Sequence, residues 1–134
     1  MLVTAVGLKD RKGHLKLEVY PANDADFLQD DNILVEQGKV FRRVEEAVPA
    51  TSPVTLCIRV PRPGSYSVIL LHDRNSNHKF DWQVDGVGFA GNPKLGWTKP
   101  KASDAKVFAS GGPTALPIVL NYHRGLGMAP IHER

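Results

Sequence analysis

The sequence predicts an all-β protein, folded as an antiparallel β-sandwich of seven strands. Short runs of strand-forming residues recur about every ten residues along the 134-residue chain, and turns rich in Pro and Gly separate them. Helical periodicity is scarce. The chain is 42% hydrophobic and 23% charged, which is ordinary globular composition and excludes disordered and collagen-like classes.

Seven runs are expected to form the strands. In chain order they are residues 2–8, 14–20, 37–48, 54–60, 65–71, 106–110 and 115–122. The second run alternates strictly, which places Leu15, Leu17 and Val19 on the core face. The fifth run, 65–71, is apolar on both faces, so we expect a central strand that is covered on both sides.

The clearest helical signal lies in residues 21–31. Asn23 is a candidate N-cap, and Asp26 follows three residues later in a box-like arrangement. We expect no more than about one helical turn there.

The strands define one sandwich domain over residues 1–122, followed by a polar tail, 123–134, that is expected to fray. Residues 74–105 contain no convincing strand, and a loop of that length in a compact domain is usually functional. This loop carries both tryptophans, Trp82 and Trp97. Their rings either cap the end of the core or form a platform for the apolar face of a sugar or peptide.

Charge and hydropathy exclude two classes of partner. The formal net charge is +3 and the pI is near 9.1, and the basic residues form no stripe, so nucleic-acid binding is not expected. No apolar stretch approaches the length of about 18 residues that a membrane span needs.

The segment 72–81 has the spacing of a calcium loop, because oxygen-bearing side chains fall on alternate residues. The candidate ligands are Asp73, Asn75, Asn77, Lys79 (through its carbonyl), Asp81 and Asp85. The pattern departs from a calcium loop at His78, where glycine is expected, and at Val84, where a bidentate acid is expected. Binding should therefore be weak, about 10⁻⁴–10⁻³ M. The alternative is an Asx-rich turn that closes itself through hydrogen bonds from side chain to backbone.

Two histidines flank this loop. His72 and His78 are candidate ligand contacts, and with Asp81 they are candidate ligands of a transition metal.

Motifs for catalysis or nucleotide binding are weak. Residues 86–91 match G-x-G-x-x-G, but no buried strand is predicted before them and Asn92-Pro93 stops any helix after them. The sequence has no nucleophile elbow, H-E-x-x-H or C-x-x-C. We therefore expect a protein that is not an enzyme and that has no cofactor apart from the candidate calcium.

The order of several motifs resembles the bacterial proteins of domain-of-unknown-function family 2141. The motifs are Lys12-Gly13 before an alternating strand, the P-G-S-Y-S-V run at 63–68, the H-D-R-N-S-N-H-K-F-D run at 72–81, and G-V-G-F at 86–89. The resemblance implies a small prealbumin-like or immunoglobulin-like sandwich. It also implies export, with a targeting peptide removed, and therefore a periplasmic or secreted location. It supplies no catalytic residues.

These observations favour an exported binding or accessory module whose 74–105 loop recognises a protein or glycan of unknown identity. One alternative is a structural or assembly protein that acts through protein–protein contacts. The other is an enzyme of a type that the motifs do not reveal, and a cytoplasmic location also stays open.

Overall fold

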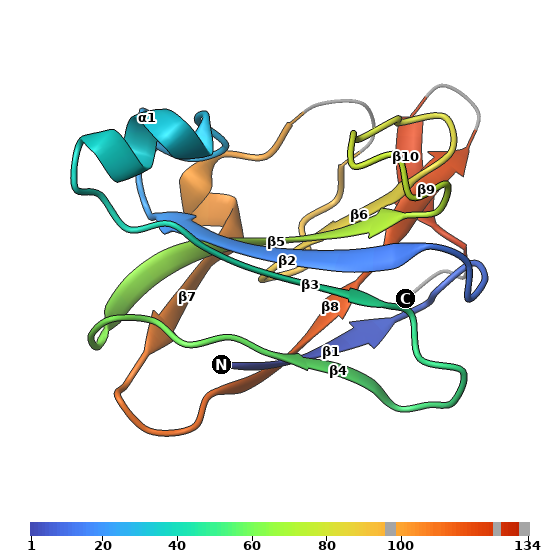
Figure 1. Ribbon diagram of the computed structural model, residues 1–134, viewed down its shortest axis with the longest axis horizontal. Helices are drawn as coiled ribbons and strands as arrows, with labels where there is room; N and C mark the ends of the chain where they lie inside the picture. The colour runs from blue at the N-terminus through green and yellow to red at the C-terminus, as the bar shows by residue number, and fades with distance from the viewer. Residues whose placement is uncertain (96–98, 125–126, 132–134) are drawn as a thin grey trace.

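The computed structural model describes residues 1–95, 99–124 and 127–131. It is all-β, with two sheets that pack face to face, and the predicted sandwich is confirmed (Figure 1). The strands are β1 (Leu2–Val6), β2 (His14–Pro21), β3 (Arg42–Ala47), β4 (Val54–Cys57), β5 (Gly64–Asp73), β6 (Gly86–Phe89), β7 (Lys106–Ala109), β8 (Ala115–Val119), β9 (Asn121–Arg124) and β10 (Gly127–Pro130). The helical elements are α1 (Asp31–Glu36) and the 3₁₀ turn η1 (Ala102–Ala105).

The small sheet has the order β4-β1-β8, and the large, seven-stranded sheet has the order β10-β9-β6-β5-β2-β3, with β7 also paired to β5. Strand β5 is central, as predicted, because it pairs with β2 along one edge and with β6 and β7 along the other. All pairs in the large sheet are antiparallel. In the small sheet β1 and β8 run parallel, which differs from the fully antiparallel sandwich predicted.

The main core lies between the two sheets. Side chains that alternate along β2 and β5 enter it, as the alternation of β2 predicts. From these two strands it receives Leu15, Leu17, Val19, Tyr66, Val68 and Leu70. Val3 and Leu56 close it from the small sheet.

A second apolar cluster covers the opposite, outer face of the large sheet. Ile69 of β5 and Phe89 of β6 pack there against Phe27, Leu34 of α1 and Ala105 of η1. In Figure 1, α1 and η1 lie on the side of the large sheet that faces away from β1 and β4. The prediction that the fifth run is covered on both faces is therefore confirmed.

The sequence missed strand β6, which lies inside the segment predicted to be a long loop. Its glycines concealed it, because glycine is a poor strand former. Glycine is needed at both positions because the main core crowds this strand. A Cβ atom on Gly86 would lie 2.7 Å from Cζ of Tyr122, and one on Gly88 would lie 2.6 Å from Cγ2 of Ile118.

The helix begins later than predicted. Asn23 and Asp26 do bond as expected, since the Asn23 Oδ1 accepts the Asp26 N–H and its amide donates to the Asp26 carboxylate. This pair closes a series of turns rather than a helix. Helix α1 starts after Asp30, whose carboxylate accepts the N–H of Asn32 as an N-cap.

The last predicted run is split between the sheets. Strand β8 belongs to the small sheet and β9 to the large one, and the chain passes between them at Leu120, whose N–H donates to the Val6 carbonyl. Strands β9 and β10 then pair, so residues 127–130 of the expected tail lie in the large sheet. Of the helices in the described part of the chain, none is both long enough and apolar enough to cross a membrane.

Candidate functional site

A cavity of about 620 Å³ opens on the outer face of the large sheet, and we call it the outer cavity. Its walls are almost entirely apolar and aromatic. They are formed by Glu18, Tyr20, Leu28, Ile69, Leu71, Phe80, Trp82, Val87, Phe89, Leu95, Lys99, Pro100, Gly127 and Met128. The predicted recognition loop supplies part of this wall, and the sheet supplies the floor.

The floor is a consequence of strand alternation. Register pairs Glu18 of β2 with Ile69 of β5, and Ile69 with Phe89 of β6, so these three side chains lie in one row across the sheet. Leu71 and Val87 are paired one step further along. Residues between them point into the main core, so one set of strands builds both the core and the cavity floor.

Glu18 is the buried polar group of the floor. Its Oε1 accepts the Tyr20 hydroxyl at 2.9 Å, and its Oε2 accepts Nε of Arg43 at 2.7 Å. Arg43 also contacts Asp31 at 3.1 Å, and its guanidinium lies 5.0 Å from the centre of the Phe41 ring. Burial and the adjacent Glu18 charge raise the pKa of Tyr20, so its hydroxyl keeps its proton. Both carboxylate oxygens of Glu18 therefore already hold a protein partner.

The rim of the outer cavity is aromatic on one side and cationic on another. Phe80 and Trp82 are 47% and 49% exposed, and the Trp82 ring packs edge-on against His123 at 4.8 Å between centres. Lys99, which is exposed, is the basic residue of the lining. Trp82 therefore lies at a cavity mouth rather than in the core, whereas Trp97 is outside the described residues.

The oxygens of the predicted calcium loop accept backbone N–H groups. Asn75 Oδ1 accepts from Asn77, Asn77 Oδ1 from Lys79, and Asp81 Oδ1 from Gln83, each two residues on. These are Asx turns, the alternative that the sequence left open. Calcium binding here stays a prediction, because an oxygen that accepts one N–H keeps a second lone pair that is free to ligate an ion.

The two buried carboxylates of this loop are also used internally. Asp85 accepts the N–H of Arg74 at one oxygen and the N–H of Asp81 at the other. Asp73 Oδ2 accepts the N–H of His78 at 2.8 Å, which holds His78 in a left-handed conformation with φ of 64°.

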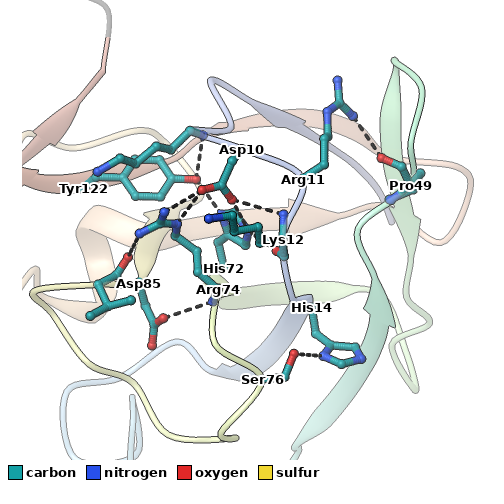
Figure 2. Close-up of polar contacts among 12 residues, drawn as sticks. Asp10, Arg11, Lys12, His14, Pro49, His72, Arg74, Ser76, Asp85 and Tyr122 are labelled. Atoms are coloured by element: carbon teal, nitrogen blue, oxygen red, sulfur yellow. Dashed lines mark hydrogen bonds and ion pairs between the residues drawn. The ribbon is translucent and has the colours of Figure 1, made fainter.

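Both ring nitrogens of His72 have hydrogen-bond partners, so His72 would have to give up one of these bonds to share a metal ion with His78 (Figure 2). The fully buried ring lies 2.7 Å from the Tyr122 hydroxyl through Nδ1 and 2.7 Å from the Lys12 carbonyl through Nε2. Since a carbonyl only accepts, Nε2 carries the hydrogen. The Tyr122 hydroxyl then donates to Nδ1 and accepts the N–H of Lys9. A neutral imidazole satisfies every group.

An ion pair beside this network joins the β1–β2 turn to the end of β5. The guanidinium of Arg74 donates through Nε to Asp10 at 2.9 Å (Figure 2). It also donates through Nη1 to the Val84 carbonyl at 2.8 Å. Partial burial alone would raise the pKa of Asp10, but the bonds from Arg74 and the Lys12 amide outweigh it, and the net pKa is lowered. Arg74 of the 72–81 motif thus joins the β1–β2 turn to the turn that follows β5.

The His72 network predicts how stability depends on pH. Burial lowers the pKa of His72, against the opposing effects of the Lys12 carbonyl and the Asp10 charge. Below its unfolded pKa of about 6.5, the unfolded chain then binds more protons than the folded one, so stability is lost as pH falls. We expect the unfolding free energy from urea melts to decrease between about pH 7 and pH 5, and to decrease less in a His72→Gln variant.

The same pH dependence in both proteins would contradict this role of His72. The titration of Asp10 does not affect this comparison between the wild type and His72→Gln. Its lowered pKa contributes stability that is lost only as pH falls through the folded value, below the unfolded carboxyl pKa of about 3.9.

Sequence reasoning missed most of the cavity floor. The sequence pattern indicates Glu18, Tyr20 and Leu71 only as strand residues, and Val87 only as a loop residue. One signal for them was present, namely the apolar character of both faces of run 65–71, which requires an apolar environment on the outer face as well.

Comparison with known proteins identifies one relationship. No curated protein and no solved structure gives a significant match to the chain. A family model described as "Uncharacterized protein conserved in bacteria (DUF2141)" matches residues 3–116, which include most of both sheets and the whole 72–81 motif. The chain therefore belongs to the DUF2141 family of bacterial proteins.

Proposed function

We propose that this protein is a non-catalytic binding module that takes a small, predominantly apolar molecule into the outer cavity. The observation that supports this most is the cavity itself. Its volume of about 620 Å³ lies within the range of roughly 300–1,000 Å³ that is usual for small-molecule sites. Most small-molecule sites are lined by apolar and aromatic side chains with a few polar groups, and the outer cavity has this composition.

The polar groups of the cavity favour binding over catalysis. Glu18 is held by Tyr20 and Arg43, so its carboxylate serves the floor of the site rather than a reacting group. Phe80 and Trp82 offer exposed aromatic faces at the mouth, where an apolar ligand would gain contact area. Lys99 would favour a ligand whose exposed end is polar or anionic.

This proposal modifies the expectation of protein or glycan recognition by the 74–105 loop. The loop becomes part of the wall of a site whose floor is the sheet. Export to the periplasm or the outside of the cell remains part of the proposal on the strength of the family resemblance. Cell fractionation of a host that expresses the native gene would test it.

The binding proposal is tested with the uncharged apolar fluorophore N-phenyl-1-naphthylamine. We expect saturable fluorescence enhancement with one site per chain. A Leu71→Lys variant places an ammonium group on the cavity floor, where desolvation is costly, and should bind the probe at least about tenfold more weakly. Leu71 is only partly buried, so the substitution should leave the fold intact, as circular dichroism would verify.

Two control variants distinguish probe binding in the outer cavity from nonspecific binding to exposed apolar surface. Leu71→Met conserves volume and apolar character and should bind the probe almost as the wild type does. Leu2→Lys removes an exposed apolar side chain from the small sheet and should have no effect. Equal loss in Leu2→Lys and Leu71→Lys, or no saturable binding by the wild type, would rule out the proposal.

A further inference from the structure

The geometry points to a second, separate site, which we propose binds a divalent transition-metal ion through Glu45, Asp73 and His78. It lies where β3, the end of β5 and the following turn meet. One ligand atom from each of the three side chains lies within 4.8 Å of the other two. The predicted metal ligands included Asp73 and His78, but Glu45 comes from a strand that the sequence did not connect to the loop.

The distances suit a small ion. Four ligands at about 2.0–2.2 Å from a tetrahedral zinc ion are about 3.3–3.6 Å from one another. The His78 Nδ1 already lies 3.3 Å from Oε2 of Glu45, so these two atoms need almost no movement to share an ion. The Asp73 carboxylate has to approach by at most about 1.5 Å to complete a three-ligand set.

Asp73 supplies an independent reason to expect an ion. Asp73 is only 5% exposed, and its Oδ1 atom is buried with no hydrogen-bond partner among the described residues. A buried carboxylate oxygen without a partner is costly, and a bound cation is one of the few groups that can satisfy it. Its other oxygen accepts the N–H of His78, so the carboxylate is held beside the residue with which it would ligate.

The donor set selects the class of metal. One imidazole and two carboxylates suit zinc and its first-row neighbours, whereas calcium requires six to eight oxygens. Lys16 is the cross-strand partner of Glu45, and it lines a small cavity with Asp73, His78 and Lys79. The ammonium groups of Lys16 and Lys79 repel any cation. Their repulsion disfavours an ion such as calcium, which is held mainly by electrostatic attraction, more than an ion that also bonds to an imidazole nitrogen. Three protein ligands leave one position for water.

The test is calorimetric titration of the full chain, without an affinity tag, with zinc chloride in a buffer that does not chelate metal. We expect one site per chain. His78→Asn should weaken zinc binding at least about tenfold. Mutating a residue that only hydrogen-bonds to a metal ligand already costs about 10–100-fold in affinity, and His78 is a ligand itself. Asparagine tolerates the left-handed backbone of residue 78 and retains the N–H that Asp73 accepts, so the turn should be preserved.

Glu45→Gln provides a second variant, because Glu45 lies on an edge strand and its loss leaves the buried groups in place. It should also weaken zinc binding. His123→Asn is the matched control, since it removes another exposed histidine that lies beside Trp82. Loss of affinity in His78→Asn and Glu45→Gln but not in His123→Asn supports the site. Absence of binding at millimolar zinc, or unchanged affinity in His78→Asn, overturns it.

Discussion

Replacing Gly13 with alanine is expected to reduce the free energy of unfolding by about 3–5 kcal/mol. Two causes act together. Gly13 has a φ of +70°, which an alanine adopts only at a cost of about 1 kcal/mol. A Cβ atom would also overlap the Asp73 carbonyl oxygen and lie 2.9 Å from Cα of Arg74, both of which are backbone atoms that cannot rotate away. Equilibrium urea unfolding measures the loss.

Gly38 offers a control for the first cause alone. Its φ is also +70°, but a Cβ atom there would meet nothing within 4 Å. Gly38→Ala should therefore lose only about 1 kcal/mol. If the two variants lose the same amount, the close approach of the β1–β2 turn to the end of β5 is not what makes glycine necessary at position 13.

Leu70→Ala is expected to destabilise the protein by about 2–5 kcal/mol. Leu70 is fully buried in the main core, and its strand pairs along both edges, so the neighbouring structure has little freedom to fill the space left behind. The loss should appear in urea melts as a lower midpoint with an unchanged slope.

A matched variant uses the same substitution on the outside of the sandwich. Leu2 is 43% exposed on β1, and Leu2→Ala should cost less than about 1 kcal/mol. A loss below about 1 kcal/mol for Leu70→Ala would contradict the central position of β5.

The strands that the sequence predicted well are those whose own side chains reveal their environment. Leu15, Leu17 and Val19 alternate with polar residues and could be placed inward from this pattern alone. Strand β6 could not be found in this way. Gly86 and Gly88 are needed there because Tyr122 and Ile118, which are more than 25 residues away in the chain, leave no room for a Cβ atom. No local pattern contains that information.

The 72–81 motif and the outer cavity also differ in how much of each the sequence could predict. The residues of the 72–81 motif were recognised as a group, yet most of their oxygens serve the backbone of the turn, which spacing alone cannot distinguish from ion binding. The outer cavity was not foreseen because Glu18, Ile69 and Val87 come from three strands and meet only through the register of the sheet. Glu45 joins Asp73 and His78 through cross-strand placement as well.

The most direct test of the binding proposal is a methyl NMR titration with N-phenyl-1-naphthylamine, because neighbouring residues of β5 report on opposite faces of one sheet. We expect shifts at the methyl groups of Ile69, Leu71 and Val87, which line the outer cavity. Those of Val68 and Leu70, which lie in the main core, should move little. Shifts centred on Val68 and Leu70, or no saturable shift at Ile69 and Leu71, would contradict the proposal that the outer cavity is the binding site.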